Sequence, residues 1–166
     1  MTVFKYNNDI LYPRRGYPHH GDCRSTNSSL PIFITVCTKD RMPLLANTRT
    51  HLVLRELWSD TSRWIVGRYV IMPEHCHFIV MEATPNSTPL RMWVGWWKRR
   101  ATILLNGVPL VWQRDVWDTV IRDQTTLAEK ISYIQNNPVR RGLVHSPSEW
   151  PFQGELTRLI LPYGAS

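Results

Sequence analysis

The chain has 166 residues, enough for one domain with a hydrophobic core of its own. Its 20 lysines and arginines outnumber its 13 aspartates and glutamates, and the net charge of +7 suits a nucleic-acid partner. Three cysteines without a CxxC spacing exclude a disulfide framework and a zinc cluster, and no apolar stretch resembles a transmembrane helix or a signal peptide. We therefore expect no membrane partner and a reducing cytoplasm.

Residues 1–30 predict an extended basic and polar arm. Arg14 and Arg15 lie there among proline, glycine, asparagine and serine, and the apolar residues follow neither a helical nor a strand period. We expect this arm to become ordered only on a ligand. A folded domain is predicted for residues 31–155, followed by a C-terminal tail at residues 156–166.

Strand and helix patterns then follow one another along the domain. The predicted elements are a strand at about 31–38, a helix at about 46–60, strands at 64–71 and 77–81, a helix at about 88–105, a strand near 110–121 and a helix at 125–137. The order β-α-β-β-α-β with an added helix predicts an α+β, ferredoxin-like fold with an antiparallel sheet. We expect helices on one face of the sheet and an active site where the sheet meets the final helix.

Two histidines one residue apart lie in an apolar run that predicts a buried strand. Because side chains at i and i+2 of a strand point to the same face, His75 and His77 should project together, about 7 Å apart along the strand. Two converging imidazoles form half of a divalent-metal site. The alternative is one surface histidine and one buried histidine whose hydrogen bonds are satisfied. Cys76, between them, should point to the other face and pack there.

The segment 125–137 predicts an amphipathic helix, because Leu127, Ile131 and Ile134 recur at helical spacing, and Pro138 predicts its end. Tyr133 and Asn137 are one turn apart and share a face. Packed against the histidine strand, that face would offer a phenol and an amide oxygen to the same metal. Such a mixed nitrogen and oxygen set suits Mg²⁺ or Mn²⁺ rather than structural zinc.

The helix that begins near residue 89 is the best candidate for nucleic-acid contact, because residues 90–100 include no acidic side chain. Trp93 and Trp97 fall on its apolar stripe and should be core residues. Trp96 lies off that stripe and is the candidate for stacking on a base. Arg91 and Lys98, seven residues apart, are predicted to share another face, with Arg99 and Arg100 beside it. The alternative is a solvated basic face with Trp96 half buried.

Taken together, these motifs resemble the single-tyrosine HUH transposases, and most closely the REP-associated tyrosine transposases. The His-hydrophobic-His strand at residues 75–77 and the Tyr-x-x-x-Asn-Pro-Val segment at residues 133–139 carry most of the resemblance. Further segments are similar in order and spacing: residues 33–41, 69–77, 111–118, 133–144 and 149–151. The resemblance spans about residues 31–155, and Trp117 stands where the family usually has a different aromatic residue.

The resemblance implies a metal-dependent endonuclease and strand transferase that acts on single-stranded DNA beside a palindromic hairpin. Tyr133 would be the nucleophile and would form a 5′-phosphotyrosine intermediate. His75, His77 and Asn137 would hold the metal, Mg²⁺ or Mn²⁺. Two alternatives stay open: a hairpin-DNA-binding protein that does not cleave, and a nuclease that uses water while Tyr133 is merely structural.

The resemblance also implies where DNA is contacted. The candidate DNA contacts are Arg14, Arg15, Arg91, Trp96, Lys98, Arg99, Arg100 and Lys130. The alternative for Lys130 is a solvent-facing helix lysine. The sequence lacks a long C-terminal helix of the kind that insertion-sequence relatives swap between subunits. This favours a monomer with Tyr133 acting in cis, with a dimer as the alternative. The resemblance also implies a location in the bacterial cytoplasm, at the nucleoid.

Overall fold

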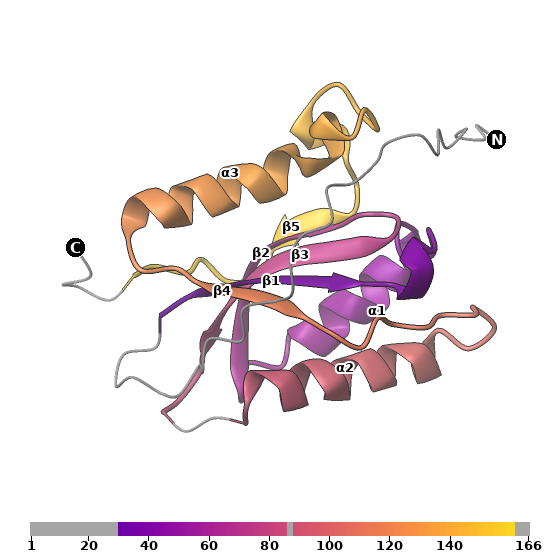
Figure 1. The fold of residues 1–166 in the computed structure, drawn as a ribbon, viewed down its shortest axis with the longest axis horizontal. Coiled ribbons are helices and arrows are strands. Elements are labelled where there is room, and N and C mark those ends of the chain that lie inside the picture. Colours follow the sequence, from indigo (N-terminus) through magenta and orange to yellow (C-terminus); the bar gives the residue numbers. More distant parts are fainter. Residues whose placement is uncertain (1–29, 86–87, 162–166) are drawn as a thin grey trace.

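The strands of the computed structural model form one antiparallel sheet, in the order β4-β1-β3-β2-β5 (Figure 1). The structure describes residues 30–85 and 88–161, so the predicted arm with Arg14 and Arg15 lies outside the described residues. The strands are β1 (Ile32–Cys37), β2 (Trp64–Ile71), β3 (His75–Glu82), β4 (Trp117–Val120) and β5 (Gln153–Glu155). The first four have the strand order of a ferredoxin-like sheet, which confirms the predicted fold class.

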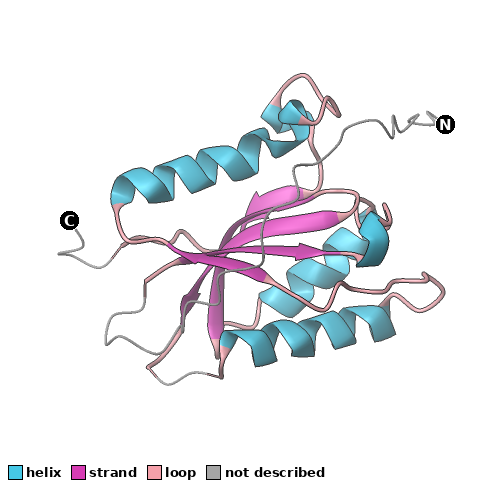
Figure 2. Ribbon diagram, viewed as in Figure 1, coloured by secondary structure: helices cyan, strands magenta, loops and turns pink. Residues whose placement is uncertain are grey.

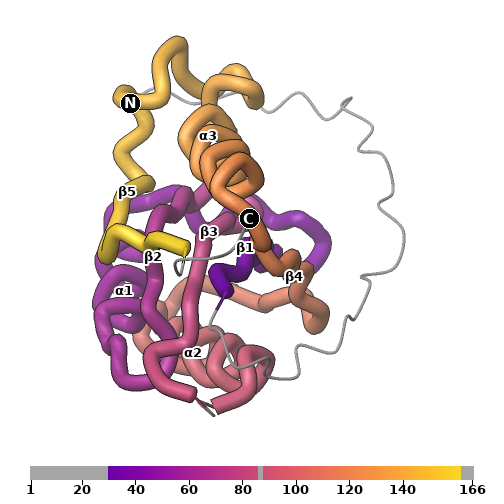
Figure 3. Tube along the Cα trace, turned by 90° about the vertical axis from the view of Figure 1, so that its left-hand side faces the viewer, coloured from indigo at the N-terminus to yellow at the C-terminus, as the bar shows by residue number. Residues whose placement is uncertain are grey.

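Helices cover both faces of this sheet. The helices α1 (Thr48–Trp58) and α2 (Leu90–Leu104) lie on one face, and α3 (Gln124–Arg140) lies on the other (Figures 1 and 3). Figure 2 shows the strands as a middle layer between these helices. The expectation of helices on one face is therefore wrong for α3. The reason is that the central strand β3 carries apolar residues on both sides, and each side needs a covering layer. No helix among the described residues is both long and apolar enough to span a membrane.

The core between the sheet and α1 and α2 is rich in aromatic residues. Trp93 and Trp97 are buried there, as predicted, and Trp58 packs between Trp97 and Phe78 with ring centroids 5.6 and 4.9 Å away. Cys76 is also buried in this layer, which confirms that it points away from its flanking histidines. Large rings dominate the packing of this side of the sheet.

A second core lies between the sheet and α3. Phe33 and Ile79 of the sheet pack there against Leu127 and Ile134 of the helix. Leu159 and Leu161 are buried in the same cluster. The packed part of the chain therefore extends past residue 155, the predicted end of the domain.

The helix α3 continues through Pro138 and ends three residues later than predicted. Proline lacks an N–H, so at this position the helix forgoes a single backbone bond and can still continue. The end is a Schellman motif, in which Gly142 N donates to the Val139 carbonyl (2.8 Å) and Leu143 N donates to the Pro138 carbonyl (3.0 Å). Gly142 has a φ of 65°, which glycine adopts without strain.

The last predicted strand, near residues 110–121, is shorter than expected. Only Trp117–Val120 pair continuously with β1, and Trp112 makes an isolated bridge to Thr38. The indole of Trp112 donates to the Lys98 carbonyl at 3.1 Å. This contact directs the chain toward α2 and away from a continuous ladder.

We predict that alanine at two glycines has opposite effects on stability. A Cβ at Gly154 would lie 2.7 Å from the Tyr69 hydroxyl oxygen, and Tyr69 is fixed by burial and a 2.8 Å contact with His51 Nε2. Gly154→Ala should therefore lower the free energy of unfolding by about 1–3 kcal/mol. Gly95, inside α2, has nothing within 4 Å of such a Cβ. Gly95→Ala should raise the free energy of unfolding by about 1 kcal/mol.

Urea unfolding of both variants measures these shifts. A Gly154→Ala protein as stable as the unsubstituted chain would contradict the close approach of β5 to Tyr69.

Candidate active site

The two histidines of β3 lie side by side on the face of the sheet that α3 covers. Their ring centroids are 4.5 Å apart, closer than the strand rise alone would place them, so the rings lean together. Both are buried, with His75 at 6% and His77 at 4% exposure. The strand parity predicted this shared orientation, and β1 and β2 on either side hold β3 in place.

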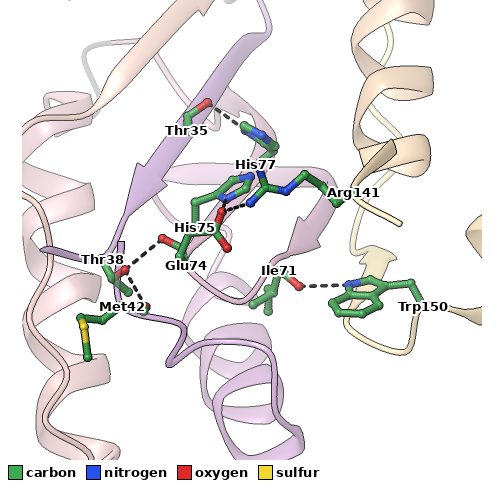
Figure 4. Close-up of polar contacts among 9 residues, drawn as sticks. All are labelled: Thr35, Thr38, Met42, Ile71, Glu74, His75, His77, Arg141 and Trp150. Carbon is green, nitrogen blue, oxygen red and sulfur yellow. Dashed lines mark hydrogen bonds and ion pairs between the residues drawn. The ribbon is translucent and has the colours of Figure 1, made fainter. Parts of the chain in front are cut away.

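Each histidine has a hydrogen-bond partner at Nδ1. His77 Nδ1 lies 2.8 Å from Thr35 Oγ1, and His75 Nδ1 lies 3.1 Å from Glu74 Oε1 (Figure 4). A partner on one ring nitrogen fixes the ring and directs the other nitrogen toward a ligand. Nε2 is therefore the nitrogen of each ring that is placed to bind a metal.

The protonation states suit ligation as well. Burial lowers the pKa of His75, the charges of Arg41 and Arg141 lower it further, and the partly compensating Glu74 does not reverse the shift. His75 is therefore neutral at neutral pH, which is the form that binds metals. Burial raises the pKa of Glu74, but its hydrogen bond with His75 and the positive charge of Arg141 bring that pKa below its ordinary value. Glu74 is thus an ionised acceptor.

Tyr133 of α3 packs directly on this site. Its ring centroid lies 5.2 Å from the ring of His77 and 5.9 Å from the ring of Phe33, which itself stacks on His77 at 5.3 Å. The guanidinium of Arg140 lies 5.0 Å from the centroid of the Tyr133 ring. On its outer side Tyr133 borders an open depression along α3, lined also by Ala128, Glu129, Ser132, Asn136 and Arg140. A substrate can therefore approach the tyrosine from solvent.

Asn137 lies between two contacts that fix its direction. Tyr133, one turn before it, touches His77, and Arg141, one turn after it, bonds to Glu74. Residues four apart share a helix face, so Asn137 faces the histidines between them. Asn137 is 6% exposed, and its Oδ1 has no hydrogen-bond partner in the described part of the chain.

An orphaned, buried carbonyl oxygen beside two neutral imidazoles fits a bound divalent cation, because a buried acceptor is costly without a partner. Within residues 30–85 and 88–161, no group of three or more histidines, cysteines, aspartates and glutamates could hold a metal ion. The sequence-based assignment of Asn137 as a third ligand stays a prediction, and the unpartnered Oδ1 is the atom that would make the bond.

The helix α2, which carries several predicted DNA contacts, lies on the opposite side of the sheet from α3 (Figure 3), and the histidines lie on the α3 side. Arg91, Arg99 and Arg100 are exposed, and Trp96 is 36% exposed. Lys130 of α3 lies beside the candidate site, with its amine 5.0 Å from the centroid of the Phe33 ring, and it is half-buried rather than fully solvent-facing.

The prediction that Lys98 shares an exposed basic face with Arg91 is wrong. Lys98 is 9% exposed, and its amine donates to the Gln113 carbonyl at 2.6 Å. Burial lowers the pKa of this amine. The cause is the rotation of α2, which buries Val94, Lys98 and Ala101 as one row against the rest of the domain.

Several residues of the site were not predicted from the sequence. Arg140 and Arg141 lie seven and eight positions after Tyr133, and a helix ending at residue 137 would not have placed them with it. Arg41 lies near enough for its charge to lower the pKa of His75, and both it and Asp40 have positive φ values of 55° and 52°. Strained backbone of this kind often occurs at functional sites. The contacts of Glu74 with His75 and Arg141 leave no signal in a single sequence.

Comparison with known proteins agrees with this geometry. No protein-family model matches the chain. The chain is 28% identical to the REP-associated tyrosine transposase of Escherichia coli strain K12 over 123 residues, which are 72% of this chain and 73% of that protein. A solved structure of a REP-associated tyrosine transposase bound to a REP hairpin superposes with a TM-score of 0.65 and 25% identity, covering 86% of this chain and 82% of that one. The chain is therefore homologous to the REP-associated tyrosine transposases.

Proposed function

We propose that this protein is a metal-dependent endonuclease and strand transferase that acts on single-stranded DNA at palindromic hairpins through a 5′-phosphotyrosine intermediate. The observation that carries the proposal is the packing of Tyr133 on His77, one helical turn from the orphaned oxygen of Asn137. The homologous structure with a bound REP hairpin supports hairpin DNA as the substrate. Its site of action would be the DNA of the bacterial nucleoid.

In this proposal His75 and His77 would bind the metal through Nε2, and Asn137 through Oδ1. Neutral imidazoles with an amide oxygen suit Mg²⁺ or Mn²⁺. When bound, the cation would polarise the scissile phosphate and stabilise the charge that develops on its non-bridging oxygens. Thr35 and Glu74 hold the two rings in the required orientation.

Tyr133 is proposed to attack the scissile phosphorus. Its hydroxyl oxygen forms the new ester bond as its proton leaves, and the bond to the 3′ oxygen of the upstream nucleotide breaks, so that this oxygen takes up a proton. The products are a 5′-phosphotyrosine and a 3′-hydroxyl. A phenol is a weak nucleophile at neutral pH, and the positive charge of Arg140 over its ring favours approach of the phosphate. Because the ester retains the phosphodiester energy, rejoining requires no energy source.

All of these side chains come from a single chain, so we propose that the site works in cis in a monomer. A site that worked in trans would need α3 of one chain to pack on β3 of another. A protein that only binds hairpins would have no use for the buried, unpartnered oxygen of Asn137, which costs stability in the absence of a ligand.

The proposed DNA contacts are Arg14 and Arg15 of the N-terminal segment, Arg91, Arg99, Arg100 and Trp96 of α2, and Lys130 beside the site. Lys98 is omitted, because its amine is buried and bonded to a carbonyl. Basic side chains neutralise phosphates and release counterions, and an exposed indole stacks on an unpaired base. Contacts on α2 would require the hairpin to extend around the sheet from the face that carries Tyr133.

We expect Tyr133→Phe to bind hairpin DNA normally and to form no covalent adduct, because the substitution removes only the attacking oxygen. The assay is denaturing electrophoresis with hairpin DNA labelled at either end. The unsubstituted protein should carry the 3′ label and release the 5′-labelled fragment.

Tyr69→Phe is the matched control, because Tyr69 is buried on the opposite face of the sheet and should leave the adduct unchanged. Fragments without labelled protein would indicate a nuclease that uses water. Binding without any fragments would indicate a non-cleaving binder.

We expect cleavage to require Mg²⁺ or Mn²⁺ and to stop in EDTA. His75→Ala and His77→Ala should abolish it and leave hairpin affinity nearly unchanged, because phosphate contacts elsewhere supply most of the affinity. His145→Ala, at an exposed position, is the control. The metal assignment fails if the protein with both His75→Ala and His77→Ala cleaves at the unsubstituted rate.

We expect Arg99→Ala together with Arg100→Ala to weaken DNA binding for all sequences alike. The slope of log affinity against log salt concentration should fall by about one unit for each phosphate that an arginine no longer neutralises. The matched control removes two exposed arginines elsewhere, Arg55 and Arg63. A salt slope that does not change, or that changes equally in the control, would show that this face of α2 is merely solvated.

A further inference from the structure

A single carboxylate links the histidine strand to the helix that carries Tyr133. Glu74, in the turn between β2 and β3, is 3% exposed. Its Oε1 lies 3.1 Å from His75 Nδ1 and 2.5 Å from Arg141 Nη2, and Arg141 is the residue that caps the end of α3 (Figure 4). Glu74 and Arg141 are 67 residues apart in the sequence.

The backbone of Glu74 is fixed as firmly as its side chain. Its carbonyl accepts hydrogen bonds from Thr38 N at 3.0 Å and from Thr38 Oγ1 at 3.1 Å. The turn is closed by Met72 N, which donates to the His75 carbonyl at 2.7 Å. The carboxylate therefore projects from a rigid support, and His75 and Arg141 must adapt to it.

The contact with His75 determines which ring nitrogen carries the proton. An ionised carboxylate only accepts hydrogen bonds, so His75 Nδ1 must be the donor and Nε2 keeps its lone pair. Thr35 contacts His77 at the same ring nitrogen. Because Thr35 belongs to β1, this hydrogen bond joins two strands of the sheet and, unlike the contacts of Glu74, does not involve α3.

The contact with Arg141 determines where α3 ends relative to β3. Asn137 lies one turn before Arg141, and Tyr133 lies one turn before Asn137. Holding Arg141 on Glu74 therefore holds both of these side chains opposite the histidines. The carboxylate of this ion pair is buried, so losing Arg141 would leave the Glu74 charge desolvated without its cationic partner.

We propose that Glu74 is a positioning residue that, by binding His75 and Arg141 through the same oxygen, sets both the tautomer of the metal-binding histidine and the placement of Asn137 and Tyr133. The part of this inference that concerns metal binding rests on the proposed function. The bridge, by which we mean the contacts of Glu74 with His75 and Arg141, does not depend on it, because these contacts lie within the chain.

The test compares Glu74→Ala, Glu74→Gln and Arg141→Ala in the full chain, with Glu155→Gln as control. Glu155 also pairs with an arginine, Arg68 at 3.4 Å, but this pair joins β5 to β2 at the more exposed edge of the sheet. The first readout is the dissociation constant of Mn²⁺ alone, without DNA. Glu74→Ala should weaken Mn²⁺ binding about 10- to 100-fold, as the loss of such a supporting partner typically does. Glu74→Gln keeps an oxygen acceptor, so its affinity for Mn²⁺ should fall less.

Combining Glu74→Ala with Arg141→Ala should weaken Mn²⁺ binding no further than Glu74→Ala alone, because both act through one bridge. Glu155→Gln should leave the Mn²⁺ dissociation constant unchanged. If Glu74→Ala does not fold, Arg141→Ala carries the same comparison, because its side chain is only partly buried. A Mn²⁺ affinity within twofold of the unsubstituted protein in Arg141→Ala and in whichever Glu74 variant folds would overturn the proposal.

The second readout is the ¹⁵N NMR spectrum of the histidine rings, which reports the tautomer without metal. The unsubstituted protein should show His75 protonated at Nδ1, and Glu74→Ala should lose this single tautomer. If the unsubstituted protein binds no Mn²⁺, the metal assignment fails, and this spectrum alone tests whether Glu74 sets the tautomer of His75. A His75 ring protonated at Nε2 in the unsubstituted protein would overturn the proposed role of Glu74.

Discussion

The alternation of side chains along β3 is the constraint on which the rest of the molecule depends. Cys76, Phe78 and Val80 point into the tryptophan-rich core beneath α1 and α2, whereas His75, His77 and Ile79 point toward α3. A shift of one residue in the pairing of β3 with β1 or β2 would exchange these faces and bury the histidines among tryptophans. The large aromatic core thus does more than stabilise the fold, because it fixes the register that makes the site.

The helix α3 supplies the other half of the site at intervals of one turn. The ring of Tyr133 packs on His77, Asn137 faces the histidines, and Arg141 donates a hydrogen bond to Glu74. The Schellman motif at Gly142 ends the helix immediately after the last of these contacts. A helix that ended at Pro138 would retain the nucleophile but lose the ion pair that holds its C-terminal end on the sheet.

Periodicity was sufficient to predict the ferredoxin-like order, the common orientation of His75 and His77, and the shared face of Tyr133 and Asn137. It could not predict which face of the sheet α3 covers, because the parity of β3 fits a helix on either side. It failed at Pro138, where tertiary packing and the glycine after the helix outweighed a local preference, and at Lys98, where the rotation of α2 buried a charged side chain. The pairing of Glu74 with Arg141 depends on how α3 docks on β3, and no local pattern encodes that.

Mass spectrometry of the covalent DNA adduct tests the central claim, that Tyr133 is the nucleophile of a site built between β3 and α3, most directly. Trypsin cuts after Lys130 and Arg140, so the peptide of residues 131–140 contains Tyr133 as its single tyrosine. After the attached DNA is trimmed with nuclease, the account predicts the residual nucleotide on this peptide, with fragment ions that assign it to Tyr133. A nucleotide on a peptide that carries another tyrosine would contradict the account, as would cleavage of hairpin DNA with no modified peptide at all.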